Sequence, residues 1–227
     1  MPAEAPTTDT SAIARRISSL CGSKWDRYYT LSKLKTDPIY AGVFRELEGR
    51  RAPLLDIGCG MGLLAFYLRE RGWQGAVEGL DYDERKIDAG RRMVAAGGYR
   101  GISLSVGDAR TDLPEHRGDV TVLDILQFFD RDEQQRLLRA AASRVAPGGK
   151  FIIRSGLRER NFRFFITQFM DFVARGTFWM KSAPVHYPTA ALFRETLEPE
   201  GFSVSLAPLW GKTPFNNYLV VARRPAG

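Results

Sequence analysis

The sequence predicts an α/β fold in which helices cover both faces of an open, doubly wound, mostly parallel sheet. Three observations support this. From Pro53 onward, short apolar runs alternate with longer segments of helical period, which is the pattern of β-α-β units. The first run ends in a glycine-rich turn, as expected where a strand passes directly into a helix. The 227 residues, 44% of them hydrophobic, are enough to bury one large core, so we expect one domain.

Five apolar runs have the length of strands, and turn or capping signals separate them. Gly72 ends the helix after the first run, Asp83 caps the helix after the second, and Asp130 with Glu133 forms a capping box after the fourth. The tripeptide 147–149, Pro-Gly-Gly, turns the chain into the fifth run. Right-handed crossovers between the strands make the sheet parallel. The predicted strands are residues 54–57, 76–80, 102–106, 119–126 and 150–154.

The segments before this core have a different pattern. Residues 1–10 show no periodicity and are predicted to be a disordered terminus. Residues 11–50 have apolar residues at helical spacing, with a break at Asp37-Pro38, and are predicted to form an N-terminal helical cap. The main domain is then expected to span residues 51–227.

The end of the chain contains an insertion and a final pair of strands. We expect residues 156–188, approximately, to form a lid, because the apolar residues from 162 to 173 follow helical spacing beside the sheet. Thr189 should cap a short helix after it. Residues 202–209 and 218–223 are predicted to be the closing strands.

The composition excludes several classes of protein. Cys21 and Cys59 are the only cysteines, too few for a disulfide scaffold or a cysteine zinc site, and no metal site is expected. No apolar run approaches the roughly 18–20 residues of a membrane span. Residues 1–10 lack the basic start and apolar core of a signal peptide. We therefore expect a cytoplasmic protein.

The net charge of +7 is unusual, and the position of the excess charge along the chain indicates which partners to consider. Residues 51–150 hold equal numbers of basic and acidic side chains, so the excess lies in the flanking segments. A basic flank is compatible with nucleic acid, an anionic membrane surface or an anionic substrate.

The first strand leads into Asp56-Ile57-Gly58-Cys59-Gly60-Met61-Gly62, which has glycines at alternate positions. Glycine permits a positive φ and lets the backbone approach a ligand closely. The spacing differs from the G-x-G-x-x-G dinucleotide fingerprint and from the phosphate-binding loop G-x-x-x-x-G-K-[ST]. Asp81 and Asp108 follow the second and third strands, at the same edge of the predicted sheet. Together these residues predict a site for a nucleotide-like ligand.

These segments resemble the class I S-adenosylmethionine-dependent methyltransferases. LLDIGCGMG resembles the family's first motif, VEGLDYD the second, VGDA the third, DVTVLDIL the fourth and RVAPGGKFII the fifth. The resemblance covers residues 54–155, approximately, and implies a Rossmann-like sheet of seven strands whose last strand is antiparallel. It also implies S-adenosyl-L-methionine as cofactor and S-adenosyl-L-homocysteine as product.

The resemblance also implies roles for individual residues. The three loop glycines would line the methionine and ribose portions, and Asp56 would face the methionyl amino group. Asp81 would accept hydrogen bonds from the ribose hydroxyls and Asp108 one from the adenine amine, while Asp124 would lie beneath the methionine and the acceptor. The candidate cofactor-binding residues are Asp56, Gly58, Cys59, Gly60, Gly62, Asp81, Tyr82, Asp108, Ala109, Asp124 and Ile125.

Methyl transfer from a sulfonium is an in-line displacement that depends mainly on alignment and the exclusion of water. A general base is needed only for an acceptor such as a hydroxyl or a protonated amine. His186 is the candidate catalytic base, since imidazole titrates near pH ~6.5. The alternative is a histidine that only packs in its loop.

The acceptor must be inferred from the two variable segments, residues 11–47 and 155–187. Both combine aromatic and basic side chains. This favours a small apolar or aromatic acceptor methylated on oxygen, either lipid-like or bound to an anionic carrier, and it suggests peripheral contact with a membrane. The sequence indicates no oligomeric state.

Methylation of RNA or another nucleic acid is the alternative function. It is disfavoured because residues 124–127 read Asp-Ile-Leu-Gln, whereas enzymes that methylate base amino groups usually have Asn/Asp-Pro-Pro-Tyr/Phe there. The Pro-Cys of the carbon-5 enzymes is also absent from this motif. A non-catalytic protein that binds the same cofactor is a third alternative.

Overall fold

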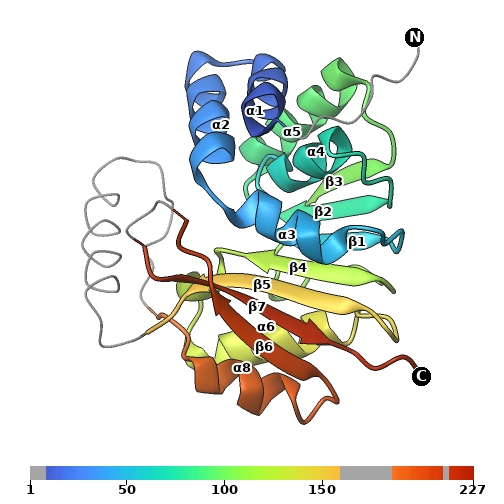
Figure 1. Cartoon of the computed structure of the whole chain (residues 1–227), viewed down its shortest axis with the longest axis vertical. Coiled ribbons are helices and arrows are strands. Elements are labelled where there is room, and N and C mark those ends of the chain that lie inside the picture. The colour runs from blue at the N-terminus through green and yellow to red at the C-terminus, as the bar shows by residue number, and fades with distance from the viewer. Residues whose placement is uncertain (1–8, 159–185, 212–214) are drawn as a thin grey trace. The chain divides into compact units, whose positions relative to one another are not determined.

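The computed structural model describes residues 9–158, 186–211 and 215–227 (Figure 1). The chain divides into two compact units, Met1–Ala109 and Arg110–Gly227. The first unit begins with helices α1 (Thr10–Ser19), α2 (Lys24–Thr36) and α3 (Ile39–Leu47). The predicted helical segment before the sheet is therefore present.

Local signals account for the ends of these helices. The Asp9 carboxylate accepts the Ser11 N–H at 2.8 Å to start α1, and Ser23 Oγ accepts the Asp26 N–H at 3.0 Å to start α2. The helix α2 ends at Asp37-Pro38, as predicted. The break between α1 and α2 was not predicted, although Ser23 is a strong capping residue.

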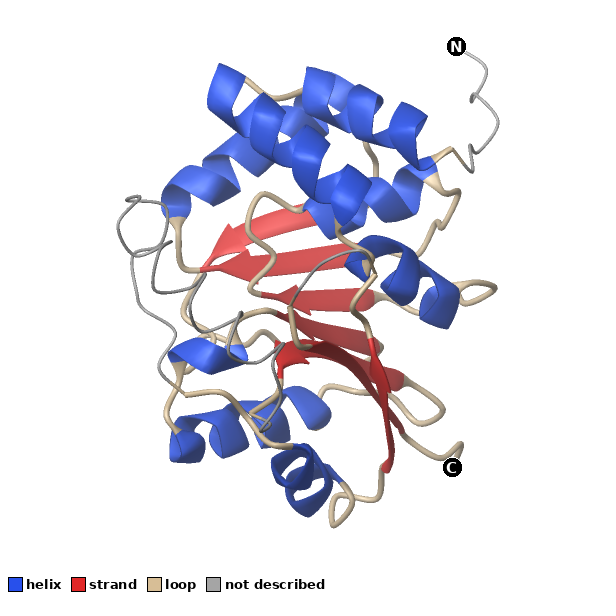
Figure 2. Ribbon diagram, turned by 60° about the vertical axis from the view of Figure 1, so that its left-hand side comes forward, coloured by secondary structure: helices blue, strands red, loops and turns tan. Residues whose placement is uncertain are grey.

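The remainder of the first unit alternates strands and helices: β1 (Leu54–Ile57), α4 (Leu63–Glu70), β2 (Val77–Asp81), α5 (Glu84–Gly97) and β3 (Ile102–Val106). The strand β1 is wholly buried and pairs in parallel with β2, which pairs in parallel with β3. The helix α1 packs against α2 and α4, which Figure 1 labels. Figure 2 distinguishes the helices, in blue, from the strands, in red. Parallel pairing brings the carboxyl ends of the three strands to one edge, where the predicted site residues lie.

The amino ends of β2 and β3 are tied together by one arginine. The guanidinium of Arg69, in α4, donates hydrogen bonds to the carbonyls of Trp73 at 2.8 Å, Gly75 at 2.7 Å, Arg100 at 3.1 Å and Gly101 at 3.0 Å. Four carbonyls of two loops are thereby satisfied by one side chain, which fixes this end of the sheet.

A second polar cluster attaches the N-terminal helix to this end. The Tyr99 hydroxyl donates to the Glu70 carboxylate at 2.6 Å, and Arg16 of α1 pairs with the same carboxylate at 3.1 Å. Burial, together with the hydrogen bond to Glu70, raises the pKa of Tyr99 above its ordinary value of about 10. The phenol is therefore held in its neutral form.

The second unit contains β4 (Asp119–Leu123), the 3-10 turn η1 (Leu126–Phe128), α6 (Arg131–Ala142), β5 (Lys150–Gly156), α8 (Ala190–Leu197), β6 (Ser203–Pro208) and β7 (Asn217–Arg223). The helices α6 and α8 pack together. The capping box of Asp130 and Glu133 and the cap at Thr189 are confirmed.

One strand is shorter than predicted. The apolar run 119–126 suggested a strand to residue 126, but β4 ends at Leu123. Asp124 has φ 61°, a left-handed conformation that no strand can contain, and the chain then turns through η1. The apolar character of the run therefore continues beyond the strand.

The seven strands of the described chain follow the order β3-β2-β1-β4-β5-β7-β6. The strand β7 is antiparallel to both neighbours, β5 and β6. This order confirms the predicted doubly wound sheet with its antiparallel last strand. Most of the expected lid at 156–188, including the helix predicted at 162–173, lies outside the described residues, and the domain boundaries remain predictions. Among the described helices, none is both long and apolar enough to cross a bilayer.

An arginine covers each edge of the sheet. Arg91 Nε donates to the Leu104 carbonyl of β3 at 2.9 Å, and Arg194 Nη1 donates to the Val204 carbonyl of β6 at 3.1 Å. An exposed edge strand is a template for pairing with another chain. A charged side chain on an edge carbonyl opposes such pairing.

Candidate functional site

The loop after β1 has the backbone conformation that its glycines predict. Gly58, Gly60 and Gly62 have φ of 78°, 57° and 79°, which side chains with a Cβ rarely adopt. The N–H groups of Gly58 and Cys59 donate to the Leu80 carbonyl, at 2.7 and 3.0 Å. The loop is therefore held against the end of β2, with a backbone that a ligand can approach closely.

Asp81 connects this loop to the start of α5. Its buried carboxylate accepts the Gly60 N–H at 2.8 Å and the Asp83 N–H at 2.9 Å. These two bonds use about half of the roughly four acceptor positions of a carboxylate. Asp81 therefore orients the loop and retains capacity to accept hydroxyl donors.

A leucine packs beneath the loop, in space left by three glycines. A Cβ on Gly62, Gly79 or Gly90 would lie 3.2, 2.6 or 2.6 Å from a Leu104 methyl. A Cβ on Gly90 would also lie 2.6 Å from the Met61 carbonyl oxygen. Glycine at these positions lets β2 and α5 approach the loop more closely than any other residue would allow.

Cys59 lies on the inner side of the loop. A Cβ on Gly79 would lie 2.8 Å from its sulfur. Burial, with the nearby carboxylates of Asp56 and Asp81, raises the pKa of the Cys59 thiol well above its ordinary value. The thiol is therefore neutral and contributes packing to the loop, while Asp56 at the end of β1 is itself buried.

The ends of β2 and β3 present apolar surface beside acids. Tyr82 is 55% exposed and Val106 is 45% exposed, and Val106 is the register partner of Asp81. Asp108 and Ala109 follow Val106 and are half-buried. The exposed ring and the apolar side chain can contact the face of a planar polar heterocycle, and the carboxylates can accept hydrogen bonds from its edge.

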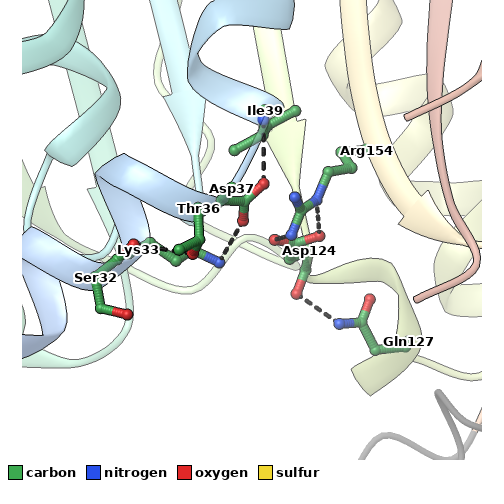
Figure 3. Close-up of polar contacts among 8 residues, drawn as sticks. All are labelled: Ser32, Lys33, Thr36, Asp37, Ile39, Asp124, Gln127 and Arg154. Carbon is green, nitrogen blue, oxygen red and sulfur yellow. Dashed lines mark hydrogen bonds and ion pairs between the residues drawn. The ribbon is translucent and has the colours of Figure 1, made fainter. Parts of the chain in front are cut away.

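In the second unit, a buried ion pair lies at the carboxyl ends of β4 and β5. Figure 3 shows the guanidinium of Arg154 directed at both carboxylate oxygens of Asp124, and Ile125 follows in the chain. The Arg154 side chain is 6% exposed and that of Asp124 is 31% exposed. This bidentate pairing fixes the Asp124 side chain, and the Asp124 N–H donates to the Arg154 carbonyl at 3.0 Å.

The chain around His186 is attached to the same region. Gln127 donates to the Asp124 carbonyl at 2.8 Å, as Figure 3 shows, and its own carbonyl accepts the His186 N–H at 3.2 Å. Gln134 of α6 donates to the His186 carbonyl at 2.7 Å. The structure thus fixes the backbone of His186 beside Gln127, which lies three residues after Asp124, while His186 itself is exposed.

Sequence reasoning missed two features of this site. The pairing of Arg154 with Asp124 was not predicted. A signal existed, because a charge that directly follows the apolar run Phe151-Ile152-Ile153 of a buried strand requires a partner. The packing of Leu104 against Gly79 and Gly90 had no such signal, since it depends on contacts between distant elements.

Comparisons with known proteins agree with this geometry. Residues 54–149 match the family model described as "Methyltransferase domain". Trans-aconitate 2-methyltransferase of Mycobacterium tuberculosis (strain ATCC 25177 / H37Ra) is 33% identical over 54% of this chain and 44% of its own length. Ubiquinone biosynthesis O-methyltransferase of Stutzerimonas stutzeri (strain A1501) is 30% identical over 63% of this chain and 61% of its own.

A solved structure has the same fold over nearly the whole chain. Magnesium protoporphyrin IX methyltransferase from Synechocystis PCC 6803, with bound S-adenosyl-L-homocysteine, matches with a TM-score of 0.66 at 19% identity, over 94% of this chain and 93% of that one. The chain spans less than half the length of the trans-aconitate enzymes that it matches, at 44%. Residues 54–149 therefore match a methyltransferase domain, in agreement with the resemblance that the sequence motifs show.

Proposed function

We propose that the protein is an S-adenosylmethionine-dependent methyltransferase that methylates an oxygen of a small apolar or aromatic acceptor. The observation that carries this proposal is the loop 58–62, with its three left-handed glycines and the hydrogen bond from Gly60 to Asp81. The match of residues 54–149 to a methyltransferase domain and the sheet order support it.

The residues present fit the cofactor part by part. Asp81 has acceptor capacity for two neighbouring ribose hydroxyls, and Tyr82 offers an exposed ring for the adenine face. Asp108 is the acceptor for the adenine amine. The glycine backbone admits the methionine portion, whose amino group is a partner for the carboxylate of Asp56.

When bound, the cofactor would supply a methyl group on a positively charged sulfur, for transfer to the acceptor oxygen with release of the neutral thioether. The protein must align the two reactants and exclude water, which in the best cases lowers a barrier by about 7–11 kcal/mol. If the acceptor is a hydroxyl, its proton must leave. We assign that proton to His186, whose backbone is fixed beside Gln127. A carboxylate acceptor needs no base.

The acceptor class rests on the two variable segments and on the relatives. The names of the two relatives described above refer to small molecules, and one specifies an O-methyltransferase. RNA remains the alternative acceptor, and a labelled-methyl assay that offers both RNA and small aromatic hydroxyl or carboxylate compounds separates the two.

Calorimetry with S-adenosyl-L-homocysteine tests the core of the proposal. Asp81→Ala removes the acceptor of the Gly60 N–H and of the ribose hydroxyls, so the dissociation constant should rise more than tenfold. Asp88→Ala is the matched control, since Asp88 lies on α5 with its side chain 48% exposed and pairs only with Arg91 at 3.5 Å among the contacts described. No binding by the unaltered protein would refute the function, and an equal effect of the two substitutions would refute the role of Asp81.

His186→Ala tests the proton transfer separately. Turnover of a hydroxyl acceptor should fall while affinity for S-adenosyl-L-homocysteine stays the same. Equal turnover in the two proteins would remove His186 as the base without affecting the assignment of the cofactor site.

A further inference from the structure

Two aromatic side chains on α2 are exposed and have no place in the cofactor site. Trp25 is 58% exposed and Tyr28 is 67% exposed, with ring centroids 6.4 Å apart. Among the described residues, the other exposed large hydrophobic side chains are Tyr82 and Val106, which belong to the candidate cofactor site. The aromatic pair on α2 therefore needs a separate explanation.

Helical periodicity places this pair on a basic face. At 3.6 residues per turn, two lysines and a serine share the solvent side of α2 with the pair, and exposed Thr36 lies at its margin. Thr30 and Leu34, on the opposite side, are buried. We call the exposed set the α2 outer face: Lys24, Trp25, Tyr28, Ser32 and Lys35.

The α2 outer face contains no acid. The nearby acid of α2, Asp26, lies off this face and accepts a hydrogen bond from Ser23 Oγ at 2.7 Å. Arg27 is exposed on the same helix, and Arg15 of the neighbouring α1 has a side chain that is 64% exposed. Residues 11–35 hold six basic side chains, of which three pair with acids outside this segment: Arg15 with Asp9, Arg16 with Glu70 and Lys33 with Asp37. Lys24, Arg27 and Lys35 remain against Asp26, so this surface still attracts anions.

We propose that the α2 outer face docks the protein on an anionic phospholipid bilayer. Trp and Tyr favour the interface between headgroups and acyl chains, since each has an apolar ring with a polar group. Lysines at both ends of the aromatic pair would contact anionic headgroups. The proposal does not depend on the methyltransferase function.

Shape and size favour a bilayer over other anionic partners. Single-stranded nucleic acid is bound in grooves lined with aromatic and basic residues, whereas this face is the convex side of a helix. A stable protein partner buries about 800 Å² on each side, usually around a larger apolar centre than two rings provide. A bilayer needs neither a groove nor a large apolar patch, and the helix lies on its surface.

Sedimentation with lipid vesicles tests the proposal. The protein should sediment with vesicles of phosphatidylcholine and phosphatidylglycerol, much less with phosphatidylcholine alone, and less at high salt. Lys24→Gln with Lys35→Gln should weaken binding about fivefold for each charge removed. Trp25→Ser with Tyr28→Ser should also reduce it. The matched control, Arg136→Gln with Arg139→Gln, removes two exposed charges from α6 and should leave vesicle binding unchanged.

Tryptophan fluorescence gives a second measurement. The emission should shift to shorter wavelength on mixed vesicles, and Trp25→Phe should abolish this shift although Trp73, Trp179 and Trp210 remain. Absence of sedimentation would overturn the proposal, as would equal losses in the α2 and α6 variants. Binding of a short single-stranded RNA that Lys24→Gln with Lys35→Gln weakens, without any binding to vesicles, would assign the α2 outer face to nucleic acid instead. Circular dichroism should confirm that each variant is folded.

Discussion

Replacing Gly79 by alanine tests whether close packing beneath the loop sets both stability and cofactor affinity. The new Cβ would lie 2.6 Å from a Leu104 methyl and 2.8 Å from the sulfur of Cys59. Both distances are shorter than a normal contact, so side chains beneath the loop must move. Because Cys59 belongs to the loop itself, its displacement should alter the backbone that faces the ligand.

Two opposing effects decide the size of the change in stability. Alanine in place of glycine restricts the unfolded chain and stabilises by about 0.4–1 kcal/mol where the folded structure accepts it. Overpacking of a well-packed core costs about 1–3 kcal/mol. We expect Gly79→Ala to lower the free energy of unfolding by about 1–2 kcal/mol, and to weaken binding of S-adenosyl-L-homocysteine about tenfold, which corresponds to ~1.4 kcal/mol.

Urea unfolding and calorimetry measure the two quantities. Cys59→Ala removes the sulfur that the new methyl meets, so the double variant with Gly79→Ala should show a favourable coupling of at least about 0.5 kcal/mol. Gly22→Ala is the control, since a Cβ at Gly22 would meet nothing within 4 Å. Unchanged stability and affinity in Gly79→Ala, or the absence of coupling with Cys59→Ala, would refute the reasoning.

Two further predictions concern charged and polar pairs. Arg154→Met leaves the Asp124 carboxylate without its bidentate partner and should lower the free energy of unfolding by about 3 kcal/mol. This is the lower end for a buried pair, because the Asp124 side chain is 31% exposed. In urea unfolding, adding Asp124→Asn should recover part of the loss, and strictly additive effects of the two substitutions would contradict this. Because the pKa of Tyr99 is raised in the folded protein, its neutral phenol stabilises the fold. This stabilisation is fully present below the unfolded-state pKa of about 10 and is lost as the pH rises above that value. Tyr99→Phe should therefore reduce the alkaline loss of stability, and identical curves of stability against pH in the two proteins would contradict the assignment.

The sequence predicted the sheet well because local patterns determine its elements. The boundaries of β1 and β3 are those of the apolar runs, and the capping residues Asp130 and Thr189 begin the helices that follow them. These signals act within a few residues, so they can be read without knowing the partners of each segment. The end of β4 was missed because the apolar run gives no local signal for the left-handed φ of Asp124, and its partner Arg154 lies 30 residues later.

In the candidate site too, features set by local sequence could be predicted, whereas contacts between distant residues could not. The positions of the loop glycines and of Asp81 could be predicted, because β-α-β connectivity alone brings strand ends to one edge. The hydrogen bond from Gly60 to Asp81 could not, and neither could the close approach of Gly79 and Gly90 to Leu104. Such contacts depend on how side chains from three elements share one volume, which no local pattern describes.

The two ends of the strands in the first unit have separate physical roles, and this separation is testable. Arg69 and Tyr99 hold the amino ends through hydrogen bonds, whereas the left-handed glycines and Asp81 lie at the carboxyl ends. A strand of five residues spans about 17 Å, too far for a lost hydrogen bond at one end to move the other directly. Tyr99→Phe should therefore lower the midpoint of urea unfolding and leave the dissociation constant of S-adenosyl-L-homocysteine unchanged. A loss of affinity that follows the loss of stability would show instead that the loop depends on the rigidity of the whole unit.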